Sequence, residues 1–265
     1  MTQLTSGSIA ILGFNGVGVD DFSFVLMTDV EAGTVIYFTD VGVLDGTDSF
    51  ANNDSTEGVV AWTASTSYSA GTVINYATDA AEFTTPSQNS AGSTSSGVDF
   101  MDGGLTGPFG DDTAGDQLIA FQADLDGATS TFENINFLFA IQSNSTEFQT
   151  SGDGAGANED PADQNQSGLP SGLIEGETAL ALGAGSGEED AVSNLVYTGP
   201  TTGTRAVLLA AIADPANWSS PDAAPSQITA DFTVTDAAAN DDPVITAPAT
   251  DTTAEDTLLN IAGVS

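Results

Sequence analysis

Positive charge is nearly missing from this chain of 265 residues, which contains one basic residue, Arg205, and no histidine. Against that single cation stand 38 aspartates and glutamates, so the formal net charge is −37. Proteins that bind nucleic acid neutralise phosphates with Lys and Arg, and attraction to anionic lipid needs the same residues. The composition therefore excludes nucleic acid and anionic membrane surfaces as partners.

Cysteine is also absent. Disulfides and thiolate metal sites are thereby excluded, and without histidine so are Ser-His-Asp and Cys-His catalysis and the usual zinc ligands. Paired-carboxylate chemistry of the glycosidase type survives, but 38 acids place some pair about 5–10 Å apart by chance. We therefore predict that the chain is not an enzyme, with a carboxylate-dependent glycosidase as the least favoured alternative.

No apolar run approaches the roughly 18 residues that a membrane-spanning helix needs, so no membrane insertion is predicted. The first residues, MTQLTSGSIAIL, lack the charged and then apolar pattern of a signal peptide. We expect either that a signal was removed or that export uses a signal beyond the C-terminal end.

The stretch of residues 7–42 contains three short apolar runs, Ile9–Phe14, Phe22–Met27 and Thr34–Thr39, separated by links rich in Gly and Asp. Runs of this length, rich in β-branched and aromatic residues, indicate strands. Because each run is almost continuously apolar, both of its faces should be covered. The prediction is an all-β fold, an antiparallel β-sandwich.

Six later segments also have strand character. They are Gly58–Thr63, Gly71–Tyr76, Gly115–Gln122, Asn134–Gln142, Thr178–Leu182 and Leu195–Tyr197, with Ile228–Val234 expected as the last strand. One short helix is predicted near residues 203–213, where RAVLLAAI precedes Pro215. Residues 77–107 and 150–172 are predicted to be long surface loops, and DLDG at 124–127 a turn.

The composition changes to small and acidic residues at DAAANDDP, residues 236–243. We therefore predict a β-sandwich domain over residues 1–235. Residues 236–265 are too few to bury a core of their own. They form an acidic linker followed either by the beginning of a repeat or by a strand that packs elsewhere.

Several segments together resemble a domain of large secreted bacterial surface proteins, distantly similar to lamin-tail-like β-sandwiches. They include GSIAILGFNG, DDFSFVLMTDVEAGTVIYFTDVG, EGVVAWT, GDQLIAFQ and LLAAIADPANW. The tail NDDPVITAPATDTTAEDTLLNIAGVS resembles the start of a bacterial cadherin-like repeat. These resemblances imply an extracellular or bacterial cell-surface location, and a globular module joined to a stalk that calcium stiffens.

Calcium is the cofactor that the composition favours, because hard carboxylate oxygens suit this ion. Two clusters are the candidate metal ligands: Asp111, Asp112 and Asp116 in one, and Asn240, Asp241, Asp242, Glu255 and Asp256 in the other. The second is similar to the interdomain calcium elements of cadherin-like repeats. A Gly-Asp turn and a solvated acidic linker are the alternatives at the two places.

Aromatic side chains could provide a platform for sugars, with Trp62, Trp218, Tyr68, Tyr76 and Tyr197 as candidates. Aromatic residues in strands lie more often in the core, and that interpretation is favoured here. The single cation, Arg205, is expected to form a structural ion pair with an Asp or Glu.

The predicted function is a non-catalytic structural or adhesive module of a bacterial cell-surface or secreted assembly. Its partners would be other copies of itself, joined through the C-terminal tail, or neighbouring repeats of the same polypeptide. The alternative is a carbohydrate-binding module, which adds glycans as partners.

Calcium removal provides the first test. If carboxylates of the folded chain bind Ca²⁺, EDTA should lower the melting temperature and added Ca²⁺ should restore it, because a ligand of the native state stabilises that state. Differential scanning calorimetry over a range of free Ca²⁺ measures this. A melting curve that does not move would contradict the calcium prediction.

Overall fold

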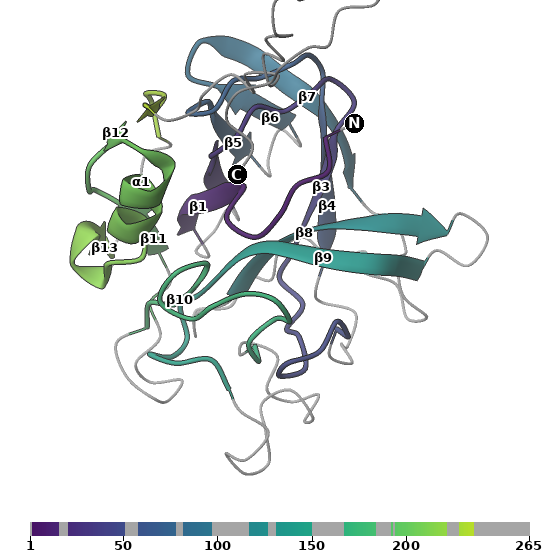
Figure 1. Ribbon diagram of the computed structural model, residues 1–265, viewed down its shortest axis with the longest axis vertical. Coiled ribbons are helices and arrows are strands. Elements are labelled where there is room, and N and C mark those ends of the chain that lie inside the picture. The colour runs from purple at the N-terminus through teal and green to yellow at the C-terminus, as the bar shows by residue number, and fades with distance from the viewer. Residues whose placement is uncertain are drawn as a thin grey trace, which may run out of the picture.

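The computed structural model describes residues 2–15, 21–50, 58–77, 82–96, 117–126, 131–149, 167–183, 192, 194–221 and 228–235. These residues are mainly in strands, with one short α-helix, so the predicted all-β class is confirmed (Figure 1). The strands are β1 (Ile9–Asn15), β2 (Phe22–Leu26), β3 (Val35–Thr39), β4 (Val59–Ala64), β5 (Val73–Ala77), β6 (Glu82–Thr85), β7 (Gln88–Ser96), β8 (Gln117–Asp126), β9 (Thr131–Gln142), β10 (Ala179–Ala181), β11 (Asn194–Tyr197), β12 (Thr202–Gly203), β13 (Trp218–Ser219) and β14 (Thr233–Val234). The helical elements are α1 (Arg205–Ile212) and a 3₁₀ turn, Pro215–Asn217.

Twelve strands form one sheet in the order β10-β9-β8-β3-β4-β7-β6-β5-β2-β1-β11-β13, and β12 pairs with β14. Pairing is antiparallel except between β10 and β9 and between β12 and β14. The sheet curls back on itself, as is shown by the hydrogen bond of 2.9 Å that the Gly7 amide, just before β1, donates to the Leu138 carbonyl on β9. Two halves of one continuous sheet thus face each other as the layers of a sandwich (Figure 1).

Alternate side chains of the central strands enter two separate cores. On β3, Ile36 and Phe38 belong to the main core inside the sandwich, and Tyr37 between them belongs to a second core on the outer face. Neighbouring strands follow the same period of two: Val60, Trp62, Leu118 and Ala120 enter the main core, and Val59, Ala61, Ile119 and Phe121 the second. Both faces are covered, which is why these runs are continuously apolar.

A buried amide holds the loops that cover the second core. Gln142 Nε2 donates to Ser145 Oγ at 2.8 Å and to the Glu147 carbonyl at 2.6 Å, and its Oε1 accepts from the Ser167 amide at 2.9 Å. The Ser167 hydroxyl in turn accepts from the Val43 amide at 3.0 Å. Each polar group in this chain of contacts has a partner, as burial requires.

Helix α1 has the bounds of the predicted segment RAVLLAAI. Thr204 caps its first turn by accepting from the Val207 amide at 3.3 Å. Leu208 and Ile212 are buried in the main core, while Val207 is exposed. The Ile212 carbonyl, one of the groups left without a helical partner, accepts from Trp218 Nε1 at 2.7 Å. No helix in the described ranges is long and apolar enough to cross a membrane.

Three predictions of local structure were wrong. Residues 82–96 were assigned to a surface loop but form β6 and β7, polar strands that pair with β5, with each other and with β4. Residues 124–126 were assigned to a turn but belong to β8. Ile228–Val234 was predicted as a strand, but only Thr233–Val234 forms one. Residues 82–96 and 124–126 are strands because they pair with neighbouring strands, and residues 228–232 are not a strand because they lack such pairing, whatever their local residue pattern.

The segment of residues 228–235 packs on β5 through a close backbone approach. The Phe232 amide donates to the Gly71 carbonyl at 2.8 Å, and Asp231 Oδ1 accepts from the Val73 amide at 2.9 Å. Gly71 has a φ of 93°, and a Cβ there would overlap the Phe232 carbonyl oxygen. Both the conformation and the contact therefore require glycine.

Replacing Gly71 with alanine should lower the free energy of unfolding more than the same change at Gly33. Gly33 has a similar φ of 79° but nothing within 4 Å of its added Cβ. Gly33→Ala should therefore cost only the left-handed conformation, about 1–2 kcal/mol. Gly71→Ala should cost roughly 1–3 kcal/mol more, because it also displaces Phe232. Urea unfolding measures both, and equal losses would contradict the contact with residues 228–235.

Candidate functional site

The predicted calcium ligands lie outside the described residues. This holds for Asp111, Asp112 and Asp116 and equally for Asn240, Asp241, Asp242, Glu255 and Asp256. Within the ranges that the structure describes, no three residues of the metal-ligating types lie together. The calcium sites therefore stay a prediction.

Several described carboxylates accept hydrogen bonds from the backbone. Asp40 is fully buried and accepts from the Gly58 amide at 2.6 Å, and Asp29 accepts from the Ala70 amide at 2.8 Å. Asp214 caps the 3₁₀ turn by accepting from the Ala216 amide at 2.9 Å. In a chain with one cation, main-chain N–H groups are the available partners for these charges. These acids have structural roles.

The aromatic residues considered as a sugar platform lie in the core, as the favoured interpretation predicts. Trp62 is fully buried, and Tyr68, Tyr76 and Tyr197 are buried as well. Trp218 is half-buried and packs edge-on against Tyr197 with ring centroids 5.8 Å apart. Four of these five rings are therefore buried, and Trp218 is partly buried and packs against the main core.

The one cation, Arg205, contacts the N-terminal segment. Its Nη2 donates to the Ser6 carbonyl at 3.3 Å. The expected ion pair with an acidic residue stays a prediction.

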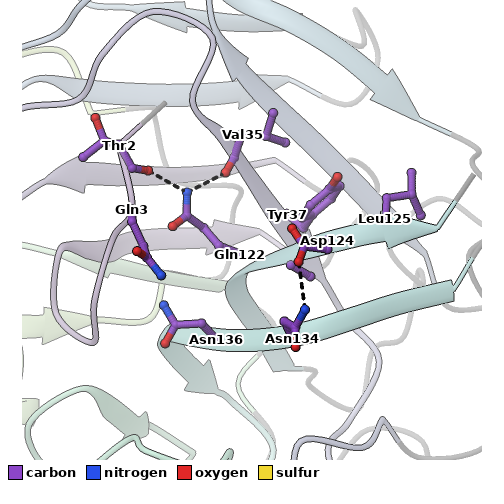
Figure 2. Close-up of a pocket in the computed structure, with 10 residues that line it drawn as sticks. Thr2, Gln3, Val35, Tyr37, Gln122, Asp124, Leu125, Asn134 and Asn136 are labelled. Atoms are coloured by element: carbon purple, nitrogen blue, oxygen red, sulfur yellow. Dashed lines mark hydrogen bonds between the residues drawn. The ribbon is translucent and has the colours of Figure 1, made fainter.

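A groove opens where β8 separates from β3. Their pairing covers Tyr37–Thr39 and Ile119–Phe121, and beyond Phe121 the strand β8 continues without pairing with β3. The resulting space has a volume of about 480 Å³ (Figure 2). Ten residues line it, and we call it the β3–β8 groove: Thr2, Gln3, Val35, Tyr37, Gln122, Ala123, Asp124, Leu125, Asn134 and Asn136.

Alternation along β8 explains why the groove is polar. Leu118 and Ala120 point into the main core, and Gln122 and Asp124 continue the same row two and four residues beyond Ala120. The row therefore changes from apolar to polar where β8 leaves the sandwich. On β9, Asn136 is the register partner of Gln122, and Glu133 that of Asp124.

An irregular register shapes the β9 side of the groove. Between Gln122 and Asp124 the pairing with β9 shifts, so that one extra residue is accommodated on β9. Asn134 lies in that interval with a φ of 52°. Its Nδ2 donates to Asp124 Oδ2 at 2.8 Å, which fixes both side chains (Figure 2). Such bulges redirect side chains and are frequent beside functional sites.

Gln122 closes the separation between β3 and β8 and also binds the N-terminal segment. Its Nε2 donates to the Val35 carbonyl at 3.0 Å and to the Thr2 carbonyl at 3.2 Å (Figure 2). Its Oε1 accepts from the Leu4 amide at 2.8 Å, and Asn136 Nδ2 donates to the Leu4 carbonyl at 2.8 Å. Two side-chain amides thus hold residues 2–4 along one wall of the groove.

Tyr37 contributes a protonated phenol at the groove. Its ring stacks on Phe121 with centroids 5.4 Å apart and meets Phe132 edge-on at 4.8 Å. Burial raises the pKa of Tyr37 above that of an exposed tyrosine, and the negative charge of Asp124 raises this pKa further. The phenol is therefore neutral across the physiological pH range.

Some polar atoms of the groove are left for a ligand. No described residue forms a hydrogen bond with the side-chain amide of Gln3, with the side-chain oxygens of Asn134 and Asn136, or with Asp124 Oδ1. These side chains are exposed. In Figure 2 the Gln3 side chain points towards Asn136. The arrangement can accept and donate hydrogen bonds, with one carboxylate among the lining residues.

Sequence reasoning missed every residue of this site. By local pattern, the Asp and Asn residues at positions 124–136 indicate a turn and the start of a strand. The useful signal was the spacing of two between Gln122 and Asp124, and between Asn134 and Asn136, next to apolar runs. That spacing predicts polar groups on one face of a hairpin.

Gln122→Ala should loosen the N-terminal segment and destabilise the fold by about 2 kcal/mol, because three hydrogen bonds with backbone groups are lost at about 1 kcal/mol or less each. Gln3→Ala, on the same segment, is the matched control and should change stability by under about 0.5 kcal/mol. Urea unfolding and hydrogen exchange at the Leu4 amide measure the two effects. Unchanged protection of that amide in Gln122→Ala would contradict the proposed role of Gln122.

Compared with protein-family models, curated proteins and solved structures, the chain shows no significant match. No relative therefore supplies a ligand or a role for the groove. The chemistry of its lining residues and the composition of the chain are what indicate function.

Proposed function

We propose that this chain is a non-catalytic adhesive module of a bacterial cell-surface or secreted assembly, and that it contacts its partner through the β3–β8 groove. The observation that supports this most is the groove itself. Hydrogen-bonded side-chain amides and one carboxylate project from the exposed part of the β8–β9 hairpin. Binding sites built on strands hold their contacts in place more accurately than sites on loops.

The set of lining residues favours binding over catalysis. Glycoside hydrolysis uses two carboxyl groups that flank the scissile bond, and Asp124 is the single carboxylate among the lining residues that the structure describes. Nucleophilic catalysis by a His-activated Ser or Cys is unavailable in a chain without His or Cys. Amides that hold a partner without transferring protons fit a module that adheres.

Calcium stabilisation and self-association through residues 236–265 belong to the same proposal. The net charge of −37 and the acidic clusters at residues 111–116 and 240–256 support calcium binding, because bound cations offset carboxylate repulsion. The resemblance of the tail to a cadherin-like repeat supports a module carried on a stalk. The location at the cell surface or outside the cell rests on the same resemblance and on the acidic, cysteine-free composition.

Retention on bacterial cells tests the adhesive function. The fluorescently labelled full chain should be retained on fixed bacterial cells in calcium-containing buffer, and the variant Asp124→Ala/Asn136→Ala should be retained at least about tenfold less, because both side chains project into the groove. Flow cytometry measures retention. Glu82→Ala, which changes an exposed acid on β6, is the control and should bind like the parent chain.

Two results would contradict the adhesive function. One is equal retention of the parent chain and the double groove variant. The other is no retention of the parent chain on any of a panel of bacteria that carry different surface polymers.

A further inference from the structure

We propose that the ligand of the β3–β8 groove is a neutral carbohydrate, held by hydrogen bonds from its hydroxyl groups to Asp124, Asn134, Asn136 and Gln3. This inference rests on the proposed adhesive function and names the class of molecule that the module binds. The groove has a volume of about 480 Å³, which lies within the range of roughly 300–1,000 Å³ that is usual for small-molecule sites.

Charge selects against acidic ligands. The groove is lined by no basic residue, and the only cation of the chain, Arg205, donates to the Ser6 carbonyl. A carboxylated or sulfated sugar would approach Asp124 within a protein of net charge −37 and meet no basic side chain among the described residues that line the groove. The ligand is therefore neutral or positively charged.

The available polar atoms match hydroxyl groups. Asp124 offers one carboxylate oxygen, and Asn134 and Asn136 offer one amide oxygen each, while Gln3 offers both a donor and an acceptor. A sugar hydroxyl donates one hydrogen bond and accepts others, so it can satisfy this mixed set. Asn134 and Asn136 are already fixed by bonds to Asp124 and to the Leu4 carbonyl, which lowers the entropy cost of binding.

The apolar lining suits the C–H faces of a sugar ring. Leu125 is one of the exposed large apolar side chains, at 38% exposure, and it lies next to Asp124 on β8. Val35 and the edge of the Tyr37 ring lie on the β3 side of the groove. Apolar surface beside fixed polar groups is the usual composition of a small-molecule site.

A peptide is a poorer match. An extended peptide binds beside a strand by pairing with free backbone groups. Where β3 and β8 separate, the Val35 and Thr2 carbonyls already accept from Gln122 Nε2, and the Leu4 amide donates to Gln122 Oε1. Gln122 thereby occupies backbone groups with which an added strand would pair, and side chains are left to make the contacts.

A glycan array followed by titration calorimetry tests the proposal on the full chain. The probes are neutral oligosaccharides of glucose, mannose and galactose, with oligogalacturonate and hyaluronan as acidic probes and oligolysine as the cationic probe. At least one neutral series should bind, with an affinity that changes less than about twofold between low and high salt, since salt screens ionic contacts only. The acidic probes should give no signal.

Matched variants connect this binding to the groove. Asp124→Asn and Glu82→Gln each remove one negative charge from an exposed strand residue, but Asp124 alone lines the groove. Asp124→Asn and Gln3→Ala should each weaken the neutral glycan severalfold to about tenfold, and Glu82→Gln should leave its affinity unchanged. Circular dichroism and urea unfolding should be the same for all three variants, so that lost binding is not lost folding.

Three outcomes would overturn the carbohydrate assignment: silence of every neutral series, binding that Asp124→Asn and Gln3→Ala leave intact, or binding of oligolysine alone with loss at high salt. Periodate oxidation of the cells separates this failure from that of the adhesive function. If retention that depends on the groove survives periodate, the adhesive function is supported and the carbohydrate assignment is wrong. If the chain binds a glycan but is not retained on cells, the carbohydrate assignment is supported and the adhesive function is wrong.

Discussion

Burial of both faces of the central strands is the constraint on which the rest of this structure depends. Strand β3 sends Ile36 and Phe38 into one core and Tyr37 into another, so neither face of the sheet can meet water. One cover comes from the other half of the same sheet, which has to curl to reach it. The other cover comes from loops that Gln142 and Ser167 hold by buried hydrogen bonds. The groove lies where the pairing of β8 with β3 ends, so that this part of β8 is no longer covered on both faces.

Much of the fold was predictable because it depends on apolar burial. The runs that became β1, β2 and β3 are recognisable from composition alone, and α1 from its Ala and Leu content before Pro215. Strands β6 and β7 were not predictable, because QNSAGSTSS carries no apolar alternation and is a strand through its pairing with β4 and β6. Ile228–Val234 alternates like a strand, yet it packs mainly by burying Phe232. Local pattern cannot distinguish such cases.

The candidate site was less accessible than the fold, for a physical reason. Trp62 and Tyr76 were correctly expected in the core because burial follows from residue type and strand context. The groove, in contrast, depends on a register shift in β9 and on the positive φ of Asn134, which come from the way β8 and β9 pair and do not follow from residue type. It also depends on residues 2–4 lying beside β8, more than a hundred positions away in sequence. No pattern within β8 or β9 indicates that contact with residues 2–4.

In a chain with a single basic residue, side-chain amides make several of the polar contacts that hold the described fold together. Gln122, Asn136 and Gln142 donate to main-chain carbonyls, a task that Lys and Arg share in ordinary proteins. Amides are neutral, so they add no attraction for anions, and they are short, so a strand must place them accurately. In the groove, the bulge at Asn134 provides that placement for the Asn134 side chain, which donates to Asp124. A surface that recognises its partner by fixed neutral amides is limited to partners rich in hydrogen-bonding groups and poor in charge, which is the chemistry of an uncharged sugar polymer.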